Sequence, residues 1–192
     1  MFSKDLGIDL GTMFTRLADS TQVLSEEPTI VAIEVADQKM VAVGQEARDM
    51  YGRVPESIEV ARPLKNGVIA DYEITETLLS YLLQRVSGSM RIFRPRVMIS
   101  VPYGVTSVER RAVYEAVLEA GSREAYLIQQ PLAAALGVDL PINSPSGNMV
   151  ISLGGGCTEA AVMAMYGIVS AETLPSGGMG LHEGIVNYVG RK

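Results

Sequence analysis

The chain has 192 residues, 47% of them hydrophobic, with a net charge of -6 and a pI of about 4.9. This acidic balance argues against nucleic acid as the main partner, since binding a phosphate backbone requires concentrated Lys and Arg. The single cysteine, Cys157, excludes a disulfide framework within the chain and favours a reduced, cytoplasmic setting. No secretory signal and no run of about 18 apolar residues is found, although peripheral membrane contact stays open.

Strand-like and helix-like segments alternate along the chain, which predicts an α/β fold. Short strands are predicted at 6–10 and 14–18, on either side of a glycine turn. A second strand pair is predicted at 30–35 and 40–43, around a polar turn, and a short helix follows at 45–51.

The middle of the chain contains the two clearest helices. The first is predicted over 75–86, where apolar residues recur at helical spacing: Leu78, Leu79, Leu82, Leu83 and Val86. A strand at 97–101 separates it from the second, predicted over 106–120. There Thr106 and Glu109 form a capping-box pattern, in which each side chain bonds the backbone of the other residue.

The remaining elements are shorter. A strand is predicted at 126–128, and a short helix begins at Pro131, where a first-turn residue needs no N–H partner. A linker rich in Pro, Ser and Asn covers 141–148. A last helix is predicted over 181–189, with its apolar residues on one face.

Two segments share one plan of strand, glycine turn and strand. The first covers 6–18, with its turn in GIDLGT, and the second covers 149–165, with its turn in LGGGCT. Glycines let the backbone approach a phosphate, hydroxyl and N–H groups bind it, and a carboxylate can hold Mg²⁺ through water. An ordinary hairpin would explain either turn alone. The repeated plan predicts two phosphate-binding hairpins that face one another across a cleft.

Longer blocks of sequence carry a resemblance to a known family. GIDLGT is similar to the first phosphate loop of the superfamily that includes actin, sugar kinases and heat-shock chaperones. Beyond it, the chain resembles the MreB family of bacterial actin-like proteins in an ordered series of blocks: EEPTIVAIE, ARPLKNGVIADYEITE, PRVMISVPYGVTSVERRAV, YLIQQPLAAALG, SGNMVISLGGGCTEAAV and GGMGLHEGIVNYVGRK.

The resemblance implies an actin-like (ribonuclease H-like) fold that comprises the first lobe and the start of the second lobe. Residues 1–31 and 73–143 would form the first large subdomain, 32–72 a small inserted subdomain, and 144–192 the incomplete start of the second lobe. ATP and Mg²⁺ would lie between the lobes. The implied protein self-associates into filaments in the cytoplasm, peripheral to the inner face of the cell membrane. There it would maintain rod shape together with the cell-wall elongation machinery.

The resemblance also assigns roles to residues. Asp9 would hold Mg²⁺ through water, Gln130 would orient the attacking water, and Ser152 would occupy a second metal-side position. Nucleotide contacts would come from both glycine turns: Gly11, Thr12, Met13, Gly154, Gly155, Gly156, Cys157 and Thr158.

Two of these positions depart from the family pattern. The family has Asp at the position of Ser152, and a hydroxyl brings no negative charge to a metal-bound water. It has Glu at the position of Gln130, whose amide can orient water but cannot act as a base, although actin also uses Gln there. Orientation is the larger task in phosphoryl transfer, so the two departures predict weakened rather than abolished ATP hydrolysis. Cys157 replaces a Thr whose contacts would be mostly through its backbone, which makes it the milder change.

The segment 89–96 combines apolar and basic residues. Ile92 and Phe93 are flanked by Arg91, Arg94 and Arg96. This pattern fits a loop that enters a lipid interface while its cations meet an anionic membrane surface. The resembling family inserts the same region into membranes. The alternative is a loop whose Phe93 folds back onto the core.

Three functions are compatible with the sequence. The first is a membrane-apposed, nucleotide-dependent filament subunit in cell-shape maintenance. The second is an enzyme, either a working ATPase or a sugar kinase of the same superfamily, although no sugar pocket is indicated. The third is a truncated or regulatory fragment that lacks a complete ATPase site.

Overall fold

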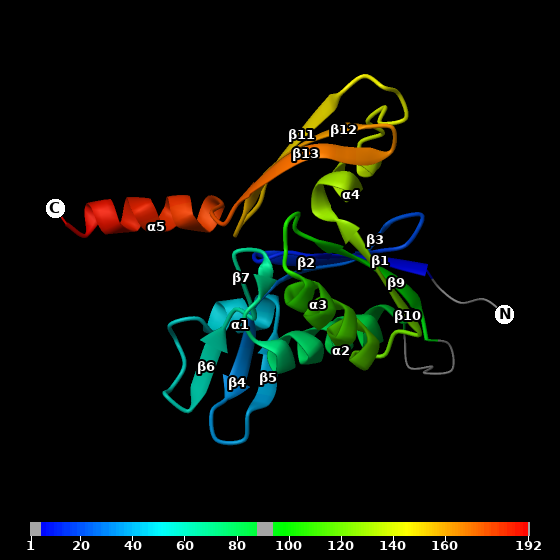
Figure 1. Cartoon of the computed structure of the whole chain (residues 1–192). Coiled ribbons are helices and arrows are strands. Elements are labelled where there is room, and N and C mark those ends of the chain that lie inside the picture. Colours follow the sequence, from blue (N-terminus) through cyan, green and yellow to red (C-terminus); the bar gives the residue numbers. More distant parts are fainter. Residues whose placement is uncertain (1–4, 88–93, 192) are drawn as a thin grey trace.

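The computed structural model describes residues 5–87 and 94–191 and confirms the predicted mixture of helices and strands (Figure 1). Its larger part is built on a five-stranded sheet, and a three-stranded sheet with a protruding helix lies beside it. Within the described ranges, no helix is long and apolar enough to cross a membrane.

The five-stranded sheet has the order β10-β9-β1-β2-β3. Its strands are β1 (Asp5–Leu10), β2 (Phe14–Ala18), β3 (Val23–Pro28), β9 (Arg96–Val101) and β10 (Glu124–Gln129). The strands β1, β9 and β10 are parallel, whereas β2 and β3 run antiparallel to their neighbours.

Side chains of β1 alternate between a buried face and an exposed face of this sheet. Leu6, Ile8 and Leu10 are buried in the main core, together with apolar residues of α2 (Tyr72–Ser87) and α3 (Ser107–Glu119). Because successive residues of a strand point to opposite faces, Asp9 lies on the face away from these helices. The sheet therefore presents a carboxylate on the side where the second glycine turn arrives.

A smaller sheet, in the order β5-β4-β6, is inserted between β3 and α2. It contains β4 (Val31–Glu34), β5 (Lys39–Val43) and β6 (Ile58–Ala61), and α1 (Gln45–Met50) buries Ala47 against it. A two-stranded hairpin, β7 (Leu64–Lys65) and β8 (Val68–Ile69), follows. Asn66 and Gly67 form its turn with φ values of 53° and 85°, which suits a two-residue hairpin loop.

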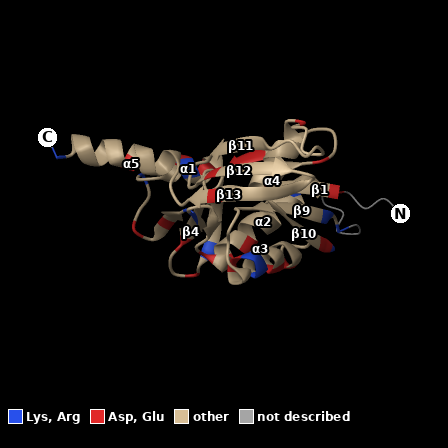
Figure 2. Cartoon of the chain, turned by 45° about the horizontal axis from the view of Figure 1, so that its top comes forward, with Lys and Arg blue, Asp and Glu red and all other residues tan. Residues whose placement is uncertain are grey.

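The third sheet is antiparallel and has the order β11-β12-β13. It consists of β11 (Asn148–Leu153), β12 (Thr158–Ala164) and β13 (Gly167–Leu174), and α4 (Gln130–Gly137) packs against it through Ala135. The last helix, α5 (Gly178–Val189), projects away from the sheet (Figure 1). Glu183 is the one charged residue within this helix, which is drawn almost wholly in tan in Figure 2.

Most predicted elements are confirmed, including the repeated strand–turn–strand plan, now β1–β2 and β11–β12. The strands β3, β6, β7, β8 and β13 were not predicted. The apolar residues expected to share one face of α5 lie exposed: Leu181, Ile185, Val186 and Val189. No described element buries them, so amphipathic spacing alone did not indicate a packed helix. The subdomain boundaries stay a prediction.

The capping box of α3 provides a test of the local sequence reasoning. The Thr106 hydroxyl accepts from Glu109 N at 3.2 Å, and the Glu109 carboxylate accepts from Thr106 N at 2.7 Å. We expect Thr106→Ala to lower the free energy of unfolding by about 1 kcal/mol in urea titrations. Thr106→Ser keeps the acceptor and should stay close to the wild type. Equal stability of the Ala and Ser variants would show that the cap contributes nothing.

Candidate functional site

The turn of the first hairpin is fixed by hydrogen bonds from several directions. Gly11 N donates to Phe14 O at 3.1 Å, and Gly11 O accepts from the Thr29 hydroxyl at 2.7 Å. The buried Thr12 hydroxyl accepts from Gly67 N at 2.9 Å, which ties the turn to the β7–β8 hairpin. These hydrogen bonds fix the conformation of the turn.

The glycine turn of the second hairpin is hydrogen-bonded to the N-terminal residues of α5. Gly154 N donates to Cys157 O, closing the turn, while Gly178 N and Met179 N donate to Gly154 O and Gly155 O, all at 2.9 Å. Within the described residues, no hydrogen bond engages the amide N–H groups of Gly155, Gly156, Thr12 and Met13. Both turns thus retain backbone donors of the kind that bind phosphate oxygens.

The two turns pack against one another closely enough to require glycine. A Cβ atom placed on Gly156 would lie 2.8 Å from Thr12 Cβ, and one placed on Gly155 would lie 2.9 Å from Met13 Cβ. Real Cβ atoms do not approach other carbon atoms so closely, so any side chain would separate the turns. The geometry supports the prediction that the hairpins face one another.

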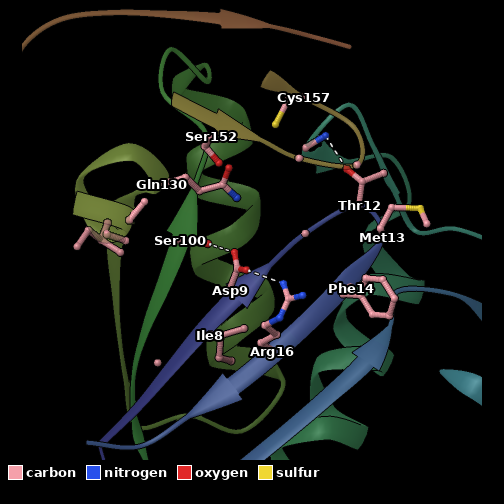
Figure 3. A pocket seen from close by; sticks show the side chains of 18 of the residues that line it. Ile8, Asp9, Thr12, Met13, Phe14, Arg16, Ser100, Gln130, Ser152 and Cys157 are labelled. Carbon is pink, nitrogen blue, oxygen red and sulfur yellow. Dashed lines mark hydrogen bonds and ion pairs between the residues drawn. The ribbon is translucent and has the colours of Figure 1, made fainter. Parts of the chain in front are cut away.

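The two turns line a pocket of about 740 Å³ together with residues from the first sheet and α4. Most of the residues predicted for the site lie in its wall: Asp9, Gly11, Thr12, Met13, Gln130, Ser152, Gly154, Gly155, Gly156 and Cys157. Figure 3 shows Gln130 and Ser152 beside each other near the second turn, with Asp9 and Ser100 on the sheet below. Thr158 was also predicted for the site but does not line the pocket. Its hydroxyl is engaged elsewhere, since it donates to Ser176 O at 2.9 Å.

The pocket fits nucleotide phosphates better than it fits a metal ion. The glycine turns leave space and N–H donors for phosphate oxygens. Mg²⁺ prefers oxygen ligands, especially carboxylates, and Asp9 is the one carboxylate among the described pocket residues. Its Oδ1 atom accepts from the Ser100 hydroxyl at 3.0 Å, and its Oδ2 atom faces the Arg16 guanidinium at 3.4 Å. No described group of three acidic, His or Cys residues could hold a metal. The Mg²⁺ role of Asp9 therefore stays a prediction that these neighbours do not favour.

Cys157 is a structural member of the second turn. Burial raises the pKa of its thiol to about 11, so the thiol stays protonated and weakly nucleophilic at neutral pH. It lies against Gly67, where an added Cβ would approach its sulfur within 3.0 Å. Cys157 thereby joins the second turn to the same hairpin that binds Thr12.

Glu159, which the sequence reasoning missed, fastens the third sheet to the first. It is 1% exposed, and its Oε1 atom accepts from Tyr103 N at 2.6 Å. The Thr173 hydroxyl donates to Tyr103 O at 2.9 Å, so both backbone groups of Tyr103 are bound from the third sheet. Burial raises the pKa of the Glu159 carboxyl, and the hydrogen bond from Tyr103 opposes this shift. The only sequence signal was a charged residue at an inward position of a strand.

A second groove of about 1170 Å³ lies on the other side of Met13 and Gly155, between the small sheet and α5. It contains three arginines, Arg48, Arg53 and Arg62, and no ion pair engages them within the described residues. Arg62 donates to Thr29 O at 3.1 Å, and burial lowers the pKa of its guanidinium. The groove is also lined by Asp49 and Glu183, so its wall carries charges of both signs.

Ile92 and Phe93, predicted to contact a membrane, lie outside the described residues, and that prediction stays untested.

Comparisons with known proteins agree with this geometry. A family model described as MreB/Mbl protein matches residues 3–192. The chain is 47% identical to the cell shape-determining protein MreB of Haemophilus influenzae, with 100% of this chain and 56% of that protein covered. It is 40% identical to the cell shape-determining protein Mbl of Bacillus subtilis, with 100% of this chain and 58% of that protein covered. The chain thus spans a little over half the length of the curated relatives it matches.

Solved structures show the same fold. MreB5 of Spiroplasma citri bound to ADP has a TM-score of 0.89 and 30% identity, with 97% of this chain and 56% of that chain covered. The MamK double helical filament has a TM-score of 0.80 at 22% identity, with 98% and 59% covered, and supports the fold alone. The expected actin-like fold is confirmed, and the chain belongs to the MreB/Mbl family.

Proposed function

We propose that this chain is the nucleotide-binding part of a filament subunit that serves in cell-shape maintenance. One observation carries the proposal: two glycine turns from separate sheets meet at one pocket and leave their amide donors available there. A nucleotide whose phosphates contacted both turns would hold the two sheets in one relative orientation. Such a fixed orientation is what a subunit needs in order to repeat its contacts along a filament.

Relatives support the nucleotide-binding half of this proposal, since two crystal structures of MreB5 of Spiroplasma citri contain ADP and AMPPNP. The assembly half rests on membership of the MreB/Mbl family, whose curated members are cell shape-determining proteins. We propose ATP as the nucleotide and self-association as the mode of assembly. We further propose that the filament lies in the cytoplasm against the inner face of the membrane, where it meets the cell-wall elongation machinery.

The first test is nucleotide binding by the 192-residue chain. Its pocket offers contacts for phosphates, while relatives have almost as much chain again that could contact the base and ribose. We therefore expect ADP to bind weakly in titration calorimetry, with a dissociation constant above about 1 μM, which corresponds to about -8 kcal/mol. Gly156→Val should abolish binding, since its side chain would push Thr12 away. Tighter binding by the wild type, or unchanged binding by this variant, would contradict the prediction.

The second test concerns hydrolysis. Gln130 can orient a water but cannot accept its proton, and Ser152 brings no charge, so both weaken the positional and electrostatic terms of phosphoryl transfer. Residues 1–192 would be joined to the remaining part of the Haemophilus influenzae relative. In that chimera, Ser152→Asp with Gln130→Glu should raise the single-turnover rate of ATP hydrolysis at least about tenfold, or about 1.4 kcal/mol of barrier.

Ser170→Asp is a matched control for this chimera, because Ser170 lies exposed on β13 and away from the pocket. It should leave the rate unchanged. An unrestored chimera that hydrolyses ATP as fast as the restored one would show that Ser152 and Gln130 do not weaken the site.

The third test concerns the membrane. Replacing Ile92 and Phe93 together with Ser should reduce co-sedimentation with anionic liposomes, since burying two large apolar side chains contributes roughly 3–5 kcal/mol. Val138→Ser with Val169→Ser removes two apolar side chains that are exposed elsewhere, and should leave co-sedimentation unchanged. If both double variants bind liposomes equally, insertion of the 92–93 segment is excluded.

A further inference from the structure

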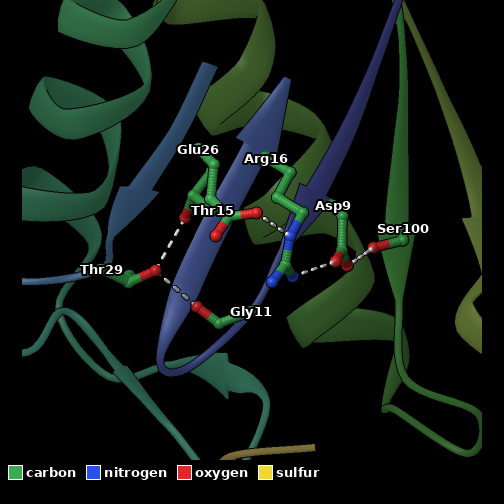
Figure 4. Close-up of polar contacts among 7 residues, drawn as sticks. All are labelled: Asp9, Gly11, Thr15, Arg16, Glu26, Thr29 and Ser100. Carbon is green, nitrogen blue, oxygen red and sulfur yellow. Dashed lines mark hydrogen bonds and ion pairs between the residues drawn. The ribbon is translucent and has the colours of Figure 1, made fainter. Parts of the chain in front are cut away.

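Four polar side chains form a row across the first sheet, on its pocket side. Ser100 on β9, Asp9 on β1, Arg16 on β2 and Glu26 on β3 occupy neighbouring strands, with Asp9 paired to Arg16 and Arg16 paired to Glu26 in the register. Figure 4 shows the row and its hydrogen bonds. Since Arg16 lies directly opposite Asp9 on the hairpin that bears the first glycine turn, the two charges share one site.

The guanidinium of Arg16 is held by a short bond to Glu26 and a longer one to Asp9. The Arg16 Nε atom donates to Glu26 Oε2 at 2.7 Å, and the Arg16 Cζ atom lies 5.7 Å from the centre of the Phe14 ring. One Nη1 hydrogen reaches toward Asp9 Oδ2 at 3.4 Å. A guanidinium has five N–H groups, and those on Nη2 have no acceptor among the described residues. Arg16 lines the pocket, so these donors remain for a ligand.

The same row disfavours a divalent metal. A cation beside Asp9 would lie close to the Arg16 guanidinium, and like charges at a few ångströms repel, although solvent reduces the effect because the two side chains are 50% and 42% exposed. The other two pocket positions where the resembling family has carboxylates hold the neutral side chains of Ser152 and Gln130. These residues do not supply the carboxylates that would offset such repulsion.

We infer that Arg16 supplies the positive charge that nucleotide phosphates meet in this pocket, and that nucleotide binding by this chain does not require Mg²⁺. Arg16 screens the phosphates from Asp9, and its free N–H groups donate to phosphate oxygens, an arrangement that guanidinium groups favour. Glu26 holds the guanidinium in the orientation that serves this role. The inference rests on the proposed nucleotide binding, and it identifies the Arg16 guanidinium, in place of Mg²⁺, as the cation that the phosphates contact.

The test is a fluorescence titration of the whole chain with the N-methylanthraniloyl derivative of ADP, once with excess Mg²⁺ and once with EDTA. The wild type should bind equally well in both buffers, within about threefold. Arg16→Leu should weaken binding in EDTA by at least about tenfold, as expected for losing charge-assisted hydrogen bonds. Arg16→Lys, which keeps the charge but not the fork of donors, should lie between the two. If the Arg16→Leu variant fails to fold, the Arg16→Lys variant alone tests the inference, and its binding in EDTA should be weaker than that of the wild type.

Arg111→Leu is the matched control, because Arg111 is an exposed arginine on α3 that also pairs with a glutamate. It should bind like the wild type. Mg²⁺ that tightens wild-type binding tenfold or more would overturn the inference while leaving the proposed function intact. So would Arg16 variants that bind as the wild type does in EDTA. A chain that binds the probe in neither buffer would instead overturn the proposed function, and the inference with it.

Discussion

The site depends on one steric constraint, the contact of two glycine turns that belong to different sheets. Gly155 and Gly156 lie against Met13 and Thr12 at distances that no Cβ atom would permit. Glycine loses more conformational entropy on folding than any other residue, so three in succession are unfavourable unless the bare backbone is required. Here the bare backbone allows the contact itself, and it belongs to pocket-lining residues whose amide groups make no hydrogen bond within the described part of the chain.

Several other contacts stabilise the packing of the two glycine turns. Gly67 donates to Thr12 and lies against Cys157, so the β7–β8 hairpin touches both turns at their junction. Glu159 follows the second turn and binds Tyr103 across the gap between the sheets. A buried carboxylate is unfavourable unless hydrogen-bonded, and the bond to Tyr103 offsets part of that cost. The β7–β8 hairpin and the bond between Glu159 and Tyr103 thus stabilise the contact between the two turns.

Local patterns in the sequence were sufficient for the elements that have strong local periodicity. The Leu spacing of α2, the capping box of α3 and the repeated glycine hairpins are all visible within a short window, and all are confirmed. The strand β3 was missed because its sequence, VLSEEP, is polar and partly exposed at the sheet edge. It forms because β2 provides a template for it, and this is a tertiary effect that local propensity does not report.

The site was predicted in its backbone and less fully in its side chains. Glycine turns are recognisable from sequence because few other residues tolerate their geometry. The pairing of Asp9 with Arg16 could have been found by counting outward from the turn between the two predicted strands. Glu159 and Tyr103 are separated by 56 residues along the chain, and no local pattern links them. Contacts of this kind depend on how the sheets are placed relative to one another.

The unusual residues of the pocket share one physical consequence. Ser152 and Gln130 are neutral, and the remaining carboxylate, Asp9, is paired with Arg16, so the described pocket carries little net negative charge of its own. A pocket that binds phosphates gains from this arrangement, because each removed or screened carboxylate removes repulsion toward the ligand. A pocket that activates water loses by it, because a proton acceptor and a metal site are both weakened. Binding and hydrolysis therefore make opposite demands on these positions. The side chains present suit the nucleotide binding that we propose, which is the step that would hold the two sheets in a fixed orientation.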